Sequence, residues 1–344
     1  MKNEVIKIVK TIFENPLSYL KFDIPQVYKN MTVIPIIVQD DKFIEFINIK
    51  EAEELELIEI VETESVGQLE VKNKSDTQVL IPFGMTVHGG KQDRTIWEPI
   101  LLPVGGKQKI VSKNPGTVKE KYTIPAKCVE QSRWNYKKNP GFKSSNTRLH
   151  PNVAYEAISA AGQNAVWNEI QSHRYEMNYL PSIAPTQSYL EMTKESEKQT
   201  GDLIKHFINI ENQCGIAVFI NGEFIGIEFY ANPNAWKTMS KDILTAFSIE
   251  ALRFMDKPKK RVTEFHDELL KFLPKLSFEY TTREGIALGN VVEFSSTDNK
   301  WRGITLVHDK NMAQFYLVSK RGGYQEKPRS NIQFQTVIDQ RYQV

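Results

Sequence analysis

Short apolar runs and alternating apolar and polar positions recur through most of the first 134 residues. Runs of about four to eight such residues predict β-strands. The pattern places strands at residues 31–38, 42–49, 55–62, 67–73, 78–90, 95–104 and 122–134. Residues 135–150 are polar and predict a loop. We therefore expect a β-rich N-terminal half, built as a sandwich or a curled sheet.

The middle of the chain changes to helical spacing. Apolar residues recur three or four positions apart from Asn152 to about Tyr179, and again over 186–208 and 239–255. Between the last two helices, residues 215–230 form two apolar runs around Asn221-Gly222, a pair typical of a two-residue hairpin turn.

Strand patterns return near the C-terminus and complete the predicted organisation. We expect an α+β fold, with a helical middle packed on the β-rich half and a returning C-terminal hairpin over 283–319. The expected divisions are an N-terminal helical extension over 1–30, one integrated α+β domain over 31–320 and a polar tail over 321–344.

Charge is distributed unevenly along a chain whose net charge is only +2. Residues 1–65 carry 13 acidic and 7 basic side chains, whereas residues 107–148 carry 11 basic and 2 acidic ones. The basic segment could attract anions or could be a solvated, lysine-rich loop. Its interleaved prolines and glycines favour the loop, so a nucleic-acid partner is not favoured.

Several common functional motifs are missing. The apolar runs are shorter than the ~20 residues that a membrane helix needs, and Glu4 and Lys7 interrupt the start of any signal peptide. Two cysteines cannot form a disulfide framework, so we expect reduced thiols and a cytoplasmic location. No metal-binding or dinucleotide-binding motif occurs, so no metal site is expected and the cofactor stays unidentified.

A first polar cluster follows the strand predicted over residues 78–90. Gly90 allows a sharp turn or a close approach to a ligand. Gln92 adds an amide, and Arg94 offers a planar donor pair for a carboxylate or a phosphate. The alternative is a β-turn whose arginine pairs with a local carboxylate.

A second cluster lies at the end of the strand over 122–134. Cys128 and Glu130 share one face of that strand, and Arg133 and Trp134 follow them. The neighbouring carboxylate would raise the pKa of the Cys128 thiol, so we expect a small buried side chain there and not a nucleophile. Glu130 on a half-buried strand is either paired with Arg94 or Arg133, or functional.

A third candidate lies in the first long helix. Gln163 and Trp167 are four residues apart and share a face. The tryptophan is expected in the core, and the glutamine is a candidate for lining a ligand pocket.

Five segments together resemble the ARG and rhodanese-phosphatase-superfamily-associated protein domain. They are GGKQDRTIWEPILLP, IPAKCVEQSRW, QNAVW, residues 214–252 and WRGITLVHDKNMAQFYLV. The likeness spans about residues 30–320 and departs at Ser132, where glycine is expected, and at Ile304-Thr305, where Ser-Ala is expected. The resemblance implies one integrated α+β domain in a cytoplasmic bacterial protein, from a family associated with conflict and signalling genes, and implies no particular reaction.

These observations lead to three functional hypotheses. The first is a binding or sensing protein for a small, possibly nucleotide-like anion, with a defence or stress role that rests on the family association alone. Its site would be lined by Gly90, Gln92, Arg94, Glu130, Arg133, Trp134 and Gln163. The second is an enzyme in which Glu130 is the general acid or base and Arg94 anchors an anionic substrate. The third is a scaffold that binds protein partners.

Overall fold

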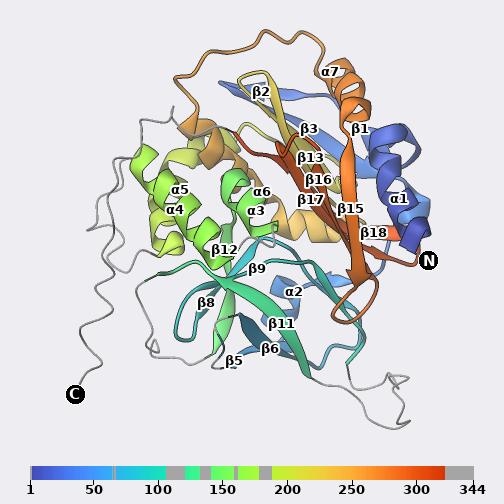
Figure 1. Cartoon of the computed structure of the whole chain (residues 1–344), viewed down its shortest axis with the longest axis vertical. Coiled ribbons are helices and arrows are strands. Elements are labelled where there is room, and N and C mark those ends of the chain that lie inside the picture. The colour runs from blue at the N-terminus through green and yellow to red at the C-terminus, as the bar shows by residue number, and fades with distance from the viewer. Residues whose placement is uncertain are drawn as a thin grey trace.

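A large antiparallel sheet and a closed barrel make up most of the fold (Figure 1). The computed structural model describes residues 2–63, 65, 67–105, 121–131, 141–158, 162–177 and 188–321. In the view of Figure 1 the large sheet lies above and the barrel below. The predicted α+β class is confirmed.

The large sheet joins strands from both ends of the described chain. Its order is β1-β3-β13-β14-β18-β17-β16-β15, and β2 also pairs with β3. The strands are β1 (Leu20–Phe22), β2 (Gln26–Tyr28), β3 (Met31–Val38), β13 (Gly215–Ile220), β14 (Glu223–Tyr230), β15 (Phe278–Glu284), β16 (Asn290–Ser296), β17 (Trp301–His308) and β18 (Asn311–Ser319).

Helices cover both faces of this sheet, which explains why its central strands are continuously apolar. Ile216 and Val218 of β13 face the core shared with α3 to α6, whereas Ala217 and Phe219 face the core shared with α1 and α7. The helices are α1 (Lys2–Glu14), α3 (Pro151–Ile158), α4 (Gln163–Glu176), α5 (Tyr189–Ile204), α6 (Pro233–Arg253) and α7 (Phe265–Phe272).

The hairpin predicted over 215–230 is confirmed. Its turn residues Asn221 and Gly222 have φ values of 55° and 77°, the left-handed conformation that the Asn-Gly pair adopts at low cost. The turn between β17 and β18 falls at Asp309 and Lys310, within the returning C-terminal hairpin expected over 283–319.

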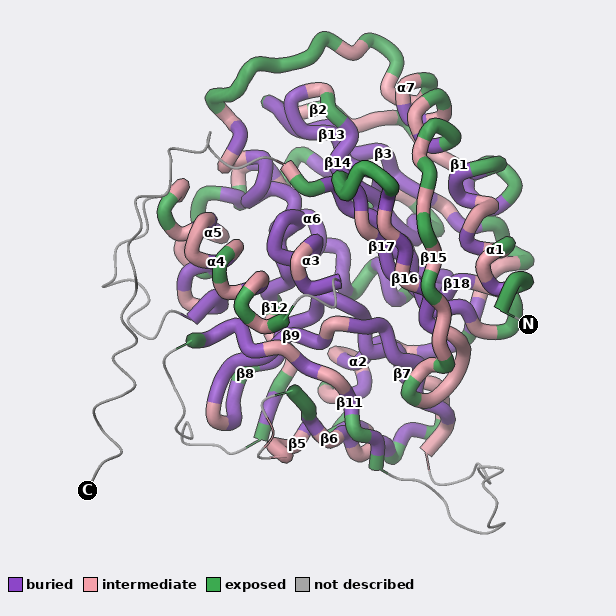
Figure 2. The backbone as a smooth tube through the Cα atoms, viewed as in Figure 1, coloured by how far each residue is buried: buried purple, intermediate pink, exposed green. Residues whose placement is uncertain are grey.

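Six strands close the barrel in the order β11-β6-β5-β12-β8-β9. They are β5 (Ile58–Glu62), β6 (Gln68–Asn73), β8 (Met85–Gly89), β9 (Arg94–Ile96), β11 (Lys121–Cys128) and β12 (Phe142–Arg148). Inward-facing aliphatic side chains such as Leu69, Val87 and Ile124 fill it. Buried residues alternate with intermediate or exposed ones along β6 and β11, as the colours in Figure 2 show. A small sheet of β4 (Ile47–Asn48), β7 (Val79–Ile81) and β10 (Ile100–Leu102) lies on the same core.

Three local predictions are wrong. The polar loop expected over 135–150 contains β12, because pairing with β5 and β8 closes the barrel and overrides its polar composition. The strand expected over 42–49 is mostly not a strand, because the backbone of Ile44 and Phe46 bonds to Ala231 and the Asn232 side chain, and α2 (Ile49–Glu54) begins directly after Asn48. The single helix expected from Asn152 is interrupted, because Gly162 is extended and starts α4 anew.

The N-terminal 30 residues are helical only in part. The helix α1 ends at Glu14, and β1 and β2 then pair with β3 at the edge of the large sheet. The division of the chain into an extension, a domain and a tail stays a prediction.

A buried polar network joins the barrel to the large sheet. Arg148 of β12 forms an ion pair with Glu228 of β14. Tyr230 and Gln314 also donate hydrogen bonds to the Glu228 carboxylate, at 2.5 and 3.0 Å. Burial raises the pKa of Glu228, while the Arg148 guanidinium lowers it.

Candidate functional site

The structure brings most of the predicted site residues together at one end of the barrel. At this end β5 and β8 finish, β9 and β12 begin, and β11 finishes. Gln92, Arg94, Cys128 and Glu130 gather here, and Arg94 pairs directly with Cys128 across the two strands. We call this cluster, with Glu62 and Asp93, the barrel mouth.

Side chains of the barrel mouth bind one another and the backbone around them. The Cys128 thiol donates to Gln92 Oε1 at 3.0 Å. Gln163, at the start of α4, accepts from the Cys128 amide at 2.8 Å and donates to its carbonyl oxygen at 2.6 Å. Glu130 Oε2 accepts from the Asp93 amide at 3.0 Å. These contacts hold β9, β11 and α4 in place.

Arg94 has no exposed side-chain surface. Its Nη2 lies 3.5 Å from the Glu62 carboxylate, and its Nη1 donates to the Ser65 carbonyl oxygen at 3.4 Å. Arg94 is therefore engaged with groups of the protein itself, as the alternative interpretation of its sequence cluster expected.

Gly90 is required by the packing of this end of the barrel. Its φ of +46° is left-handed, and a Cβ there would lie 2.3 Å from the Phe142 ring and 2.8 Å from Glu62 Oε2. The sequence allowed a sharp turn or a close approach to a ligand at Gly90, and the close contact in the structure is with the Phe142 side chain.

The predicted members Arg133 and Trp134 lie outside the described residues. In the described part, three buried carboxylates (Glu62, Asp93 and Glu130) belong to the barrel mouth, and Glu62 pairs with Arg94. The general acid or base role of Glu130 stays a prediction.

Cys128 and Cys214 are free and buried, as expected. Burial raises the pKa of the Cys128 thiol to about 11, although the Arg94 guanidinium opposes this shift. A thiol with so high a pKa is a poor nucleophile near neutral pH.

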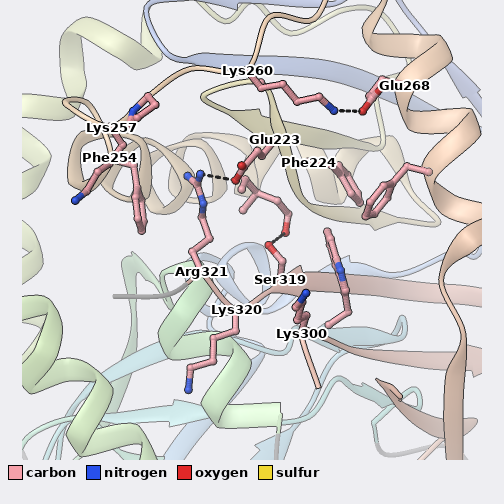
Figure 3. Close-up of a pocket in the computed structure, with 15 residues that line it drawn as sticks. Glu223, Phe224, Phe254, Lys257, Lys260, Glu268, Lys300, Ser319, Lys320 and Arg321 are labelled. Atoms are coloured by element: carbon pink, nitrogen blue, oxygen red, sulfur yellow. Dashed lines mark hydrogen bonds and ion pairs between the residues drawn. The ribbon is translucent and has the colours of Figure 1, made fainter. Parts of the chain in front are cut away.

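Basic side chains gather instead in a pocket of about 670 Å³ beside the large sheet (Figure 3). It lies between the turn of the β13–β14 hairpin, the segment joining α6 to α7, α7 itself, the start of β17 and the end of β18. We call it the basic pocket. Its basic side chains are Lys257, Lys260, Lys300, Lys320 and Arg321, and its acidic ones are Glu223 and Glu268.

Hydrogen bonds fix the backbone on one side of the basic pocket. The Lys260 amide donates to the Asn221 carbonyl oxygen at 2.8 Å, and the Asn221 side chain donates to the Phe254 carbonyl oxygen at 2.7 Å. Gly222 packs so closely here that a Cβ would lie 2.1 Å from the Lys260 carbonyl oxygen. The exposed segment after α6, which arches over the top of Figure 2, is thus tied to the hairpin turn at Lys260.

Arg321 is also held in a defined position. Its amide donates to the Asn152 side chain and its carbonyl oxygen accepts from the same side chain, both at 3.0 Å. Its guanidinium lies 4.2 Å from the centre of the Phe254 ring and 2.9 Å from the Glu223 carboxylate. This pre-positions a planar pair of donors at the pocket.

Aromatic rings form another part of the pocket lining. Phe224 and Trp301 stack with centroids 5.1 Å apart, and Phe272 packs against both rings. Lys260 pairs with Glu268 at 2.5 Å, and this contact holds the pKa of the Glu268 carboxyl below its ordinary value. The pocket therefore combines an apolar wall with basic side chains.

The sequence prediction missed this pocket because its parts are far apart in the chain. Residues 256–261 (DKPKKR) resemble a lysine-rich linker, and residues 320–321 begin the expected polar tail. The available signal was that basic residues follow strand β18 directly, at Lys320 and Arg321, and follow helix α6 within a few residues, from Lys257. That signal becomes a site only when strand pairing brings both segments to the β13–β14 turn.

Two negative findings apply to the part of the chain that the structure describes. Within those residues, no three His, Cys, Asp or Glu side chains are placed to hold a metal ion. None of the helices there combines the length and apolar character that crossing a bilayer would require.

The fold and its two polar sites define an α+β protein with a buried cluster at a barrel end and a separate basic pocket. The model of the ARG and Rhodanese-Phosphatase-superfamily-associated Protein domain matches residues 19–113 and 117–318. The chain therefore belongs to this family, as its sequence motifs indicated. No curated protein and no solved structure matches it significantly.

Proposed function

We propose that this protein binds a small anion, in the manner of a binding or sensing protein, and that the anion occupies the basic pocket. The observation that carries the proposal is the lining of that pocket, in which five basic side chains face two acidic ones. Its volume of about 670 Å³ lies within the range of ~300–1,000 Å³ usual for small-ligand sites.

The barrel mouth is a less favourable place for the anion than the basic pocket. There, the Arg94 side chain is fully buried and already engages the Glu62 carboxylate and the Ser65 carbonyl oxygen. In the basic pocket, Lys257, Lys260, Lys300 and Lys320 are exposed, so they can bind a ligand without leaving a buried charge unpaired.

We place this activity in the bacterial cytoplasm, in a defence or stress system. The two free cysteines are compatible with a reducing compartment. The defence or stress role is supported only by the genomic association of the family.

Calorimetric titration of the full chain tests the binding proposal. Orthophosphate, citrate and tripolyphosphate are titrated into the wild type and into a Lys260→Gln/Arg321→Gln variant. We expect at least one of these anions to bind, and the variant to bind it about tenfold or more weakly, because each lost charged contact contributes about 1.5–3 kcal/mol.

A matched control removes the same charge elsewhere. Lys72 and Lys121 pair with Glu59 and Glu70 on the barrel, and Lys72→Gln/Lys121→Gln should leave the affinity within about twofold of the wild type. Equal weakening in both variants would show a non-specific charge effect, and no binding of any of the three anions would contradict the proposal.

A further inference from the structure

Two basic side chains of the basic pocket are paired with the pocket's own carboxylates. Arg321 lies 2.9 Å from Glu223 at the start of β14, and Lys260 lies 2.5 Å from Glu268 on α7. The dashed lines in Figure 3 mark both pairs, which come from different elements. The pocket thus has two separate places where a carboxylate already meets a cation.

These carboxylates are exposed enough to be exchanged. The Glu223 side chain is 61% exposed and that of Glu268 is 35% exposed. Exposed ion pairs contribute little to stability, so an incoming anion can take the place of either carboxylate at small cost. The carboxylates then act as competitors of the ligand.

The remaining basic side chains favour an anion with several charged groups. Lys257, Lys300 and Lys320 come from three further places around the pocket, after α6, before β17 and after β18. Lys300 lies 3.8 Å from Asp298, and Lys320 pairs with Glu156, both carboxylates outside the pocket lining. The two lysine side chains stay exposed, so an anion can compete for them as well. In the view of Figure 3, Lys260 lies above the pocket and Lys300 and Lys320 lie below it. An anion with one charged group can meet only one part of this arrangement.

We infer that the ligand of the basic pocket is an oligophosphate, an anion with two or more linked phosphate groups, and that Glu223 and Glu268 compete with its phosphates for Arg321 and Lys260. Phosphate oxygens suit both the planar guanidinium fork and the point charge of lysine. The pocket volume exceeds what one phosphate fills, and the wall of Phe224 and Trp301 can contact an organic group attached to the chain. This inference rests on the proposed function and specifies its ligand class.

Calorimetry with inorganic tripolyphosphate and orthophosphate, at constant ionic strength, tests the inference on the full chain. The wild type should bind tripolyphosphate about tenfold or more tightly than orthophosphate, since several contacts form at once. A Glu223→Gln/Glu268→Gln variant, which removes both competing charges and keeps side-chain size, should bind tripolyphosphate about threefold to tenfold more tightly still.

The control variant is Glu59→Gln/Glu70→Gln on the barrel. These carboxylates also pair with exposed lysines, at 2.9 and 3.1 Å, and the variant should stay within about twofold of the wild type. Equal affinity for the two phosphates would overturn the oligophosphate inference and leave the proposed anion binding standing. Unchanged or weaker tripolyphosphate binding in the pocket variant would overturn the competing role of the two carboxylates, and absence of any phosphate binding would overturn both.

Discussion

The barrel mouth and the basic pocket both collect charged side chains from distant segments, but they place those charges differently. At the barrel mouth, Arg94 and the Glu62 and Glu130 carboxylates are almost fully buried and bind groups of the protein. In the basic pocket, most lysines are exposed and two basic side chains meet exposed carboxylates.

The difference shows why polarity in a strand is weak evidence for a binding site. A buried charge must be paired, so polar residues inside a fold are commonly engaged in holding it together. An exposed charge keeps its capacity to bind a ligand. Stability and binding should therefore separate between the two regions, and four measurements test this separation.

The largest expected effect is the loss of stability when Arg94 is truncated. Arg94→Ala should lower the free energy of unfolding by about 3–5 kcal/mol, because it leaves the buried Glu62 carboxylate without its guanidinium. Arg321→Ala should cost less, about 1–2 kcal/mol, because Glu223 remains solvated although the packing of Arg321 on Phe254 is lost. Urea denaturation measures both. Similar losses in the two variants would remove the contrast between the regions.

Thiol reactivity provides a second contrast. Cys128 should react with a thiol reagent at pH 8 about a hundredfold more slowly than a free thiol, because burial raises its pKa to about 11. A cysteine introduced at the exposed Lys300 position should react at the ordinary rate and be protected by tripolyphosphate. The labelling rates are measured from the change in absorbance after the thiol reagent is mixed with the protein. Fast labelling of Cys128 in the native protein would reopen its candidacy as a nucleophile.

Two glycines allow a matched backbone test. Gly90→Ala should destabilise the fold by about 1–3 kcal/mol through its clash with Phe142 and leave ligand affinity unchanged. Gly222→Ala should destabilise the fold to a similar extent and also weaken tripolyphosphate binding, because the added methyl displaces Lys260. Denaturation and calorimetry on each variant separate the effects. Weakened tripolyphosphate binding in Gly90→Ala would show that the barrel mouth and the basic pocket are coupled.

Salt should produce the smallest effect. Raising potassium chloride from 0.05 to 0.5 M should weaken tripolyphosphate binding about fivefold or more, because salt screens exposed charges. The stability difference between the wild type and Arg94→Lys should change little, because buried charges are screened less. Titrations and melts at both salt concentrations check this. A salt-independent affinity would indicate that the exposed lysines do not contact the ligand.

Some features were determined by the sequence alone, because short-range physics decides them. The Asn221-Gly222 turn follows from the low cost of positive φ at these two residues. The strand β3 at Met31–Val38 was predicted at its observed bounds, because it is a short apolar run in which β-branched residues predominate. The buried state of Cys128 was predicted from its place on the strand expected over 122–134.

Other features depended on partners distant in sequence. The polar strand β12 exists because β5 and β8 supply its hydrogen bonds, and no local pattern in residues 142–148 reports those partners. The sequence also predicted that Gln92, Arg94, Glu130 and Gln163 lie together, and it could not tell that their polar atoms engage one another and the backbone. The direction and burial of a side chain depend on the closure of the barrel.

The basic pocket was decided by tertiary structure entirely. Its basic residues occur as a linker, a turn and the end of a strand, each of which is ordinary on a protein surface. They meet because β14, β17 and β18 are neighbours in the large sheet and the segment after α6 is tied to the β13–β14 turn. Charge along a chain is set by the sequence, whereas the field that a ligand meets depends on which charges the fold places side by side.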